Sequence, residues 1–359
     1  MVFVVGLGLL SAFLVNDTIA ILGVPLAIYV MRSIKQIPIV LLIGLAFGIS
    51  IGSVMTPIGN PQNLLIAIQG GIQLPFMTFI TILAIPTVIN LLLTYLILKV
   101  YFRKELLHMQ YTLNMMNLPE QYKKSSDDSD ADPQIVMNNT VHTTITNPTL
   151  AKISVIILLI VISGFIIVEA LRFLGIITDR GFSISIITIM GATILYAISK
   201  ERTELIKSID YSILIFFAAM FVFTAGLWSS GLMLEILSYI PNPVPNSSLA
   251  GNNAIIASIS ISISHLLGNV PFVALYNLVM IDNGFAGDDV YEWMMLAGAS
   301  TIAENLTILG GASIIIIIGA AESRGFKSFG YVEFLKIGSI VTLVTVIIYY
   351  LFILFVSYI

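Results

Sequence analysis

Hydrophobic residues run along this chain in long stretches that polar residues interrupt only briefly. The longest stretches cover residues 37–55 running on to 68, 76–102, 153–174, 182–199, 211–230, 293–321 and 331–358. A helix needs about 20 apolar residues to cross about 30 Å of hydrocarbon. The pattern therefore predicts an all-α polytopic membrane protein.

Two further apolar regions are each divided into arms too short to cross a membrane. The region 2–31 is divided by the polar Asn16-Asp17-Thr18, and the region 254–281 by Gly268-Asn269. Apolar runs of about 10–14 residues are typical of re-entrant or buried helices. We predict two helical hairpins that enter the membrane and turn back midway.

Two of the long stretches contain breaks. One break reads Thr56-Pro57-Ile58-Gly59-Asn60-Pro61-Gln62-Asn63, and the other reads Glu304-Asn305-Leu306-Thr307-Ile308-Leu309-Gly310-Gly311. Proline and glycine open the hydrogen-bond ladder of a helix, and opened backbone at membrane depth is tolerated only where protein or a water-filled cavity covers it. The two broken transmembrane helices therefore indicate a binding site.

The hairpin and the break recur in the same order, which indicates an internal repeat. Asp17 corresponds to Asn269, Thr56 to Thr307 and Gly59 to Gly310. We predict a first repeat at 1–102, a polar linker at 103–152 and a second repeat at 153–359 that begins with three scaffold helices. An odd number of predicted spans lies between the hairpins, so the repeat is inverted. Such symmetry is typical of secondary transporters.

The two repeats differ at their beginnings. Three ordinary spans precede the second hairpin, whereas the first hairpin begins at Met1. We therefore expect an N-terminal scaffold of about three helices to be missing. Either the start is misassigned, or a partner chain supplies that part, or the protein is degraded.

The distribution of positive charge predicts the orientation in the membrane. Of the 16 lysines and arginines, only Arg172 and Arg180 fall on the side opposite the linker 103–152. Positive charge accumulates in cytoplasmic loops, so the linker is predicted to be cytoplasmic in a multi-pass plasma-membrane protein. The first hairpin then enters from the cytoplasm and the second from outside.

Composition narrows the classes of function. The chain of 359 residues is 58% hydrophobic and 10% charged, with a net charge of -4, no cysteine and three histidines. Disulfides and thiolate metal sites are excluded, and no basic cluster suggests nucleic acid. Neither a nucleophile–base pair nor a phosphate loop points to an enzyme, and no cofactor or metal site is expected. Two inverted repeats with interrupted hairpins are typical of carriers that work by alternating access, and they disfavour a channel with an open pore.

The breaks supply the candidate chemistry. A helix that stops in the membrane leaves amide hydrogens for an oxyanion at one end and carbonyl oxygens for a cation at the other. Small polar side chains add hydrogen bonds without a charge to dehydrate. The candidate substrate and ion-binding residues are Asn16, Asp17, Thr18, Thr56, Pro57, Gly59, Asn60, Pro61, Asn63, Gly268, Asn269, Glu304, Asn305, Thr307, Gly310 and Gly311.

Two carboxylates stand out among these residues. A carboxylate at membrane depth is costly and is a functional candidate by default. Asp17 is predicted to bind the coupling ion, a proton or sodium, and the alternative is that it caps the second arm of its hairpin. Glu304 is either a second proton site or a residue in a wet crevice.

Four segments resemble the ion transporter superfamily, which includes arsenite permeases, NhaD-type sodium/proton antiporters and sodium/dicarboxylate symporters. Residues 11–18 (SAFLVNDT) resemble the first hairpin of the arsenite-permease branch, and 56–64 (TPIGNPQNL) resemble the first break. Residues 267–271 (LGNVP) and 299–310 (ASTIAENLTILG) are similar to the second tip and break. The sequence departs from the family at Glu304, where a small residue is expected. Ile314 also stands where the first copy has Asn63.

The resemblance implies a carrier whose hairpins and broken helices form a moving substrate site. The function expected is secondary active transport of a small anion or metalloid oxyacid, arsenite permease-like, coupled to protons or sodium. The alternatives are a sodium-coupled di- or tricarboxylate (citrate-like) transporter and a sodium/proton antiporter. A truncated non-transporting fragment, or one subunit of a split carrier, is the alternative of another class. The expected partners are the solute, the lipid bilayer, and either a second copy or a chain that supplies the missing helices.

Overall fold

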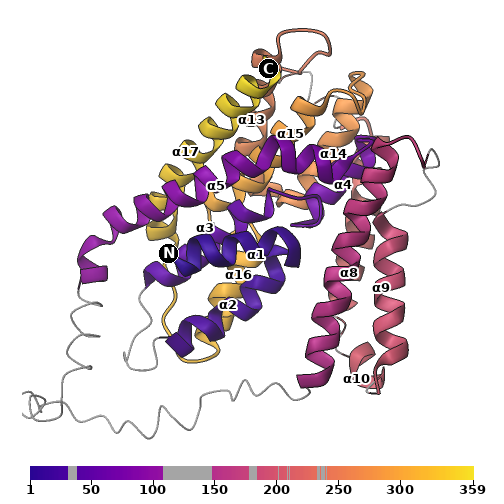
Figure 1. Ribbon diagram of the computed structural model, residues 1–359. Coiled ribbons are helices and arrows are strands. Elements are labelled where there is room, and N and C mark those ends of the chain that lie inside the picture. Colours follow the sequence, from indigo (N-terminus) through magenta and orange to yellow (C-terminus); the bar gives the residue numbers. More distant parts are fainter. Residues whose placement is uncertain are drawn as a thin grey trace, which may run out of the picture.

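The computed structural model describes residues 1–30, 39–107, 148–177, 184–200, 202–207, 209, 211–232, 235, 239 and 241–359. Within these ranges every regular element is a helix (Figure 1). The elements are η1 (Val2–Gly6), α1 (Leu7–Leu14), α2 (Asn16–Val30), α3 (Ile39–Ser53), α4 (Pro61–Gln69), α5 (Pro75–Tyr101), α8 (Pro148–Phe173), α9 (Ile184–Ile198), α10 (Arg202–Lys207), α11 (Tyr211–Ser229), α13 (Leu249–Leu267), α14 (Asn269–Asp282), α15 (Val290–Ile302), η3 (Ala303–Leu306), α16 (Ala312–Glu322) and α17 (Tyr331–Ser357).

The long apolar helices make this an all-α polytopic membrane protein. In the described part of the chain, α5, α8, α13 and α17 are each long and apolar enough to cross a membrane. Shorter apolar helices, among them α2, α3, α14 and α16, adjoin the places where the chain changes direction. Most of the predicted linker at 103–152 lies outside the described residues.

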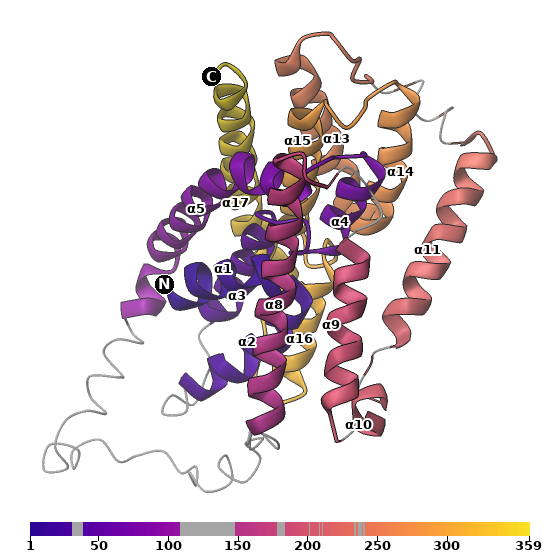
Figure 2. The ribbon, with the colours of Figure 1, turned by 45° about the vertical axis from the view of Figure 1, so that its right-hand side comes forward.

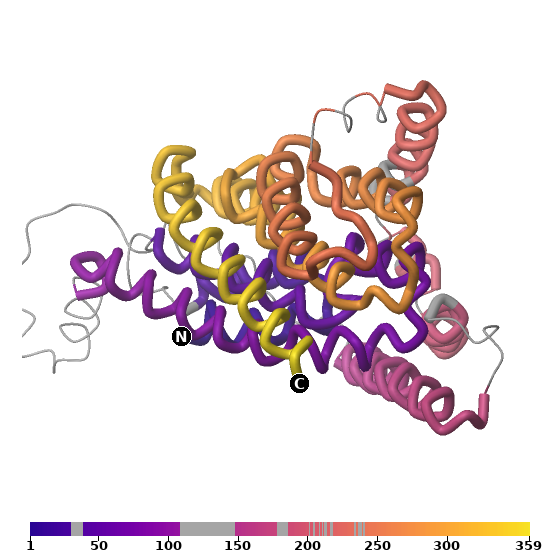
Figure 3. The backbone as a smooth tube through the Cα atoms, turned by 90° about the horizontal axis from the view of Figure 1, so that it is seen from above, coloured from indigo at the N-terminus to yellow at the C-terminus, as the bar shows by residue number. Residues whose placement is uncertain are grey.

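The two halves of the chain contain the same series of elements and make matching contacts. In the first half α1 packs on α3, and in the second half α13 packs on α15. The second arm of each hairpin also packs across the halves, α2 on α16 and α14 on α4, in addition to its contacts within its own half. Figure 3 shows the indigo-to-purple half beside the orange-to-yellow half, with α17 packed obliquely on α5. The opposite entry of the two hairpins into a membrane stays a prediction.

Helix α13 is longer than the sequence pattern predicts. It begins at Leu249 rather than near residue 254, because Ser248 caps it by accepting a hydrogen bond from the backbone N–H of Gly251. The polar Asn252 fits inside the helix since its side chain bonds both backbone groups of Val244, at 3.0 Å each. The first arm of the second hairpin is therefore of full spanning length.

Helices α8, α9 and α11 stand beside this two-half assembly (Figure 2). Glu169 ties α8 to the assembly, because its two carboxylate oxygens accept hydrogen bonds of 2.8 Å from the N–H groups of Phe76 and Met77. These amides belong to the first turn of α5, which has no side-chain cap of its own. Phe165 of α8 stacks on Phe76 with ring centroids 4.9 Å apart. A buried carboxylate at a helix N-terminus is stabilised by the free amides and by the helix dipole.

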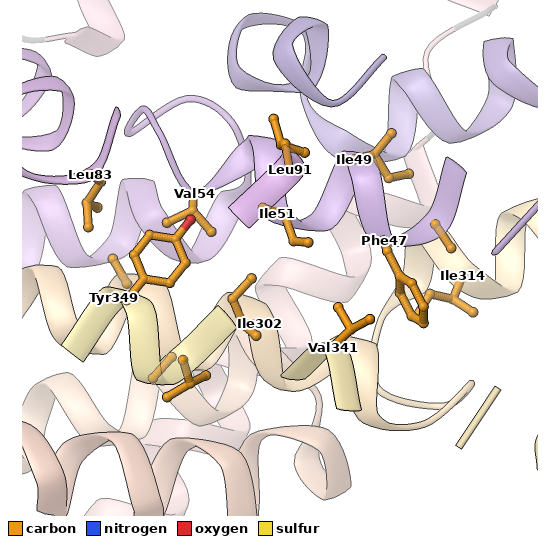
Figure 4. Close-up of a cluster of buried hydrophobic side chains, with 14 of the residues drawn as sticks. Phe47, Ile49, Ile51, Val54, Leu83, Leu91, Ile302, Ile314, Val341 and Tyr349 are labelled. Atoms are coloured by element: carbon orange, nitrogen blue, oxygen red, sulfur yellow. The ribbon is translucent and has the colours of Figure 1, made fainter. Parts of the chain in front are cut away.

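Side chains from both halves fill the core between them. Figure 4 shows Phe47, Ile49 and Ile51 of α3 gathered with Ile314, Val341 and Tyr349 from the second half. The phenol of Tyr349 is fully buried and lies 2.7 Å from the hydroxyl of Thr87 in α5. The halves therefore share one hydrophobic core.

Glycines bring α1 and α3 into backbone contact. A Cβ at Gly52 would overlap the carbonyl oxygen of Gly8, and a Cβ at Gly8 would lie 2.7 Å from the carbonyl oxygen of Gly48. Small residues that allow backbones to approach are typical of helix contacts in membranes.

We expect Gly52→Ala to lower the free energy of unfolding by about 1–3 kcal/mol or more, because the new methyl group meets rigid backbone. The matched control is Gly319→Ala in α16, where a Cβ meets no atom within 4 Å. That change should be neutral or stabilising by up to about 1 kcal/mol, since alanine favours helix. Thermal unfolding of the two purified variants in detergent measures both effects, and equal melting temperatures would contradict the close contact.

Candidate functional site

The first break is closed by its own side chains. Asn60 caps α4 by accepting a hydrogen bond of 2.8 Å from the N–H of Asn63. The amide of Asn63 donates to the carbonyl oxygens of Ser53 at 3.1 Å and Thr56 at 3.0 Å. Backbone groups that the break removes from the helix ladder are thus paired inside the protein.

The tip of the first hairpin docks on this break. At the tip Val15 has a φ of 59°, which reverses the chain between α1 and α2. The backbone N–H of Asn16 donates to the carbonyl of Gly59 at 3.0 Å, and the hydroxyl of Thr56 donates to the carbonyl of Ala12. Gly59 is required here, since a Cβ would overlap the carbonyl oxygen of Ser53.

Thr301 of α15 inserts between the side chains of the first break. Its hydroxyl lies 3.3 Å from the amide nitrogen of Asn60 and 3.4 Å from that of Gln62. The hydroxyl of Ser50 donates to the carbonyl of Thr301 at 3.3 Å. Thr301 is a site residue that is absent from the candidates predicted from the sequence. The signal was present, because the register that aligns Thr56 with Thr307 also aligns Ser50 with Thr301.

The second break contains a buried carboxylate. The chain leaves α15 through η3 and re-enters helix at Ala312. At the second tip, Gly268 has a φ of 87°, and Asn269 accepts a hydrogen bond of 2.8 Å from Ser264. The amide of Asn269 donates to Oε2 of Glu304 at 3.1 Å. Glu304 is 2% exposed and its Oε1 has no hydrogen-bond partner.

Groups from both halves surround this carboxylate. The side chains of Ser50 and Asn16 lie beside Glu304, and Asp17 lies close enough for the two carboxylates to interact electrostatically. Glu304 is thus the point where α3, the first hairpin tip and the second hairpin tip converge. A ligand bound here would lie near side-chain amides, a hydroxyl group and carboxyl groups.

Asp17 itself is half-buried in the first turn of α2. The hydrogen bond at the start of this helix runs from the Asp17 N–H to the side-chain oxygen of Asn16 at 2.9 Å. Within the described residues the Asp17 carboxylate makes no hydrogen bond, so Asn16 rather than Asp17 provides the local pairing.

The remaining candidate residues lie in or next to the breaks and tips. Pro57 belongs to the first non-helical segment, Pro61 opens α4, and Thr18 is exposed on α2. Asn305 is fully buried in η3, and its side-chain amide has no hydrogen-bond partner. Thr307, Gly310 and Gly311 lie between η3 and α16. In the described ranges no group of three or more His, Asp or Glu side chains could hold a metal ion.

Comparison with known proteins relates the chain to carriers. Residues 1–284 match the CitMHS family, described as citrate transporter. The protein named arsB of Dictyostelium discoideum is 25% identical over 92% of this chain and 70% of its own length. The arsenical pump membrane protein of Escherichia coli is 22% identical over 93% of this chain and 71% of its own length. An uncharacterized transporter of Mycobacterium tuberculosis is 23% identical over the same shares.

We expect Asn63→Leu to destabilise the protein by about 1–3 kcal/mol, because the buried carbonyl oxygen of Ser53 loses the Asn63 amide as its donor, whereas that of Thr56 keeps the N–H of Gly59 at 3.3 Å. The matched control is Asn253→Leu in α13, since the buried Asn253 amide has no hydrogen-bond partner to lose. That control should be neutral or stabilising. Chemical unfolding in detergent compares the two, and an equal loss of stability in both would argue against the first break as a closed network.

Proposed function

The chain belongs to the CitMHS citrate transporter family, and we propose that it is a secondary active carrier of a small anion or metalloid oxyacid, driven by protons or sodium ions. The observation that carries this proposal is the convergence of both hairpin tips and the second break on buried Glu304. Discontinuous helices that meet in this way are how many secondary transporters bind solute and coupling ion together.

The residue types at the site favour a solute held by hydrogen bonds. No lysine or arginine occurs in residues 11–18, 50–64, 264–271 or 299–314. Asn16, Asn269 and Asn305 offer amides that both donate and accept. Arsenite, which is largely an uncharged trihydroxide at neutral pH, suits such a site without a fixed cation. The relatives named arsB and arsenical pump membrane protein support this choice.

A second candidate solute is a di- or tricarboxylate, which the family's description supports. In this site its negative charge would depend on helix N-termini, side-chain amides and a co-transported cation. The two candidate solutes thus differ in charge. Measuring the transport of arsenite and of citrate by the same preparation distinguishes between them.

Asp17 is our proposed group for the coupling ion. It lies half-buried at the first tip and interacts electrostatically with Glu304. A solute bound beside Glu304 would therefore change the electrostatic environment of the Asp17 carboxylate. A carboxylate at membrane depth that makes no hydrogen bond can bind a proton or sodium ion at low structural cost. Since positive charge gathers around 103–152, we place this linker in the cytoplasm and the protein in the plasma membrane.

We expect Asp17→Asn to abolish gradient-driven accumulation while solute exchange persists, because the variant binds solute but no coupling ion. The full chain is reconstituted in liposomes, and uptake of radiolabelled arsenite or citrate is measured under an imposed proton or sodium gradient. The control is Asp282→Asn, the same change at an exposed carboxylate at the end of α14. Undiminished accumulation by Asp17→Asn would remove Asp17 from coupling. Absence of uptake by the wild type under either gradient would refute the carrier proposal for these solutes.

A further inference from the structure

The two breaks have matching backbones but opposite arrangements of side chains. In the repeat register Ser53 corresponds to Glu304, Asn60 to Gly311 and Asn63 to Ile314. Gly59 packs on the backbone of Ser53, and Gly310 packs in the same way on the backbone of Glu304. The first half therefore has its polar side chains at the C-terminal end of the break, and the second half has its carboxylate at the N-terminal end.

Glu304 occupies the space that an asparagine cap would take. A Cβ at Gly311 would overlap Oε2 of Glu304, and the carboxylate carbon of Glu304 would lie only 3.1 Å from it. In the first half the amide of Asn60 extends from the corresponding position to Ser53 Oγ at 3.0 Å. Glu304 stands where the family resemblance predicts a small residue. The absence of a side chain at Gly311 leaves the space that the Glu304 carboxylate occupies.

The consequence is an uncapped helix. Helix α4 has Asn60 as its side-chain cap, whereas α16 begins after Gly311 with no side-chain cap. The first N–H groups of a helix have no partner within it, and together with the helix dipole they attract anions. The carboxylate of Glu304 lies at this end of α16.

Unpaired polar atoms are confined to one of the two breaks. Every buried side-chain nitrogen and oxygen of residues 50–63 has a hydrogen-bond partner. In residues 300–313 the buried polar atoms without a partner are Ser300 Oγ, Glu304 Oε1, both amide atoms of Asn305, and Ser313 Oγ. Ser313 lies in the first turn of α16 and is fully buried. Buried unpaired groups are costly, and the two that lie at this end of α16, Glu304 Oε1 and Ser313 Oγ, indicate a ligand that pairs with them.

We infer that the first turn of α16 is the oxyanion subsite of the cargo, and that the side chain of Glu304 occupies this subsite as an internal competitor until the cargo displaces it. This inference rests on the proposed function, because it assumes a cargo with anionic or hydroxyl oxygens. The first break takes no cargo, since its own side chains already pair its polar groups. Glu304 is then a specificity-determining residue: its ionised form excludes anions, and Asn269 is released to the cargo when Glu304 moves away.

Exchange of side chains between the halves provides the test. Glu304→Ser opens the subsite, and the double variant Glu304→Ser with Gly311→Asn rebuilds the closed arrangement of Ser53 and Asn60. Citrate binding to the purified full chain is measured by equilibrium dialysis at pH 8, with melting temperature as the measure of folding. We expect Glu304→Ser to bind citrate at least tenfold more tightly than the wild type. The double variant should bind at least tenfold more weakly than Glu304→Ser at an unchanged melting temperature.

A second variant covers the case in which Glu304→Ser fails to fold. Glu304→Gln keeps the volume and the acceptor for Asn269 but removes the charge, so citrate affinity should rise at least threefold. Affinity that falls or stays unchanged in Glu304→Gln or in folded Glu304→Ser would overturn the competitor role. Equal binding by Glu304→Ser and the double variant would overturn the subsite. These outcomes are independent of wild-type uptake of arsenite or citrate, which decides the carrier proposal itself.

Discussion

The structure depends on one constraint: a helix that opens inside a membrane must find partners for the backbone groups it exposes. In the described ranges two helices open in this way, and each half meets the constraint differently. Asn60 and Asn63 pair the exposed groups of the first break, and Asn16 and Thr56 attach the adjacent tip to it. The second break has a glycine and an isoleucine at the two asparagine positions, so its pairing is incomplete and its polar atoms remain available.

This difference gives the halves different tasks within a common core. The first break is a contact surface for Thr301, whose hydroxyl accepts hydrogen bonds from the side-chain amides of Asn60 and Gln62. The second break holds Glu304 against Gly311 with one hydrogen bond from Asn269. The side chains of Ser50 and Asn16 also lie beside this carboxylate, so the site joins the two halves, and alternating access requires their relative movement. Glu169, in contrast, fixes α8 to the start of α5 through two short hydrogen bonds.

The positions of the helix breaks could be predicted from the sequence, because proline, glycine and asparagine are conspicuous within apolar stretches. The α-helices end at Leu14, Ser53, Leu267 and Ile302, next to the predicted polar groups, and the 3-10 helix η3 (Ala303–Leu306) extends into the second predicted break. The start of α13 could not be predicted, since hydropathy treats Asn252 as a break and only the fold supplies its partners at Val244. Pairing across the halves, as at Thr301, depends on packing rather than on local pattern. Glu304 looked anomalous in the sequence, and only its contact with Gly311 shows how the fold accommodates it.

We expect the two hairpins, whose tips meet at Glu304, to enter the membrane from opposite faces. Because the chain has no cysteine, single cysteines can be placed at Tyr29, which is 61% exposed near the end of α2, and at exposed Asp282 at the end of α14. The measurement is labelling by a membrane-impermeant maleimide in intact cells and in inside-out vesicles. The account predicts that Tyr29→Cys reacts only from the cytoplasmic side and Asp282→Cys only from outside. Reaction of both cysteines from the same side would contradict it.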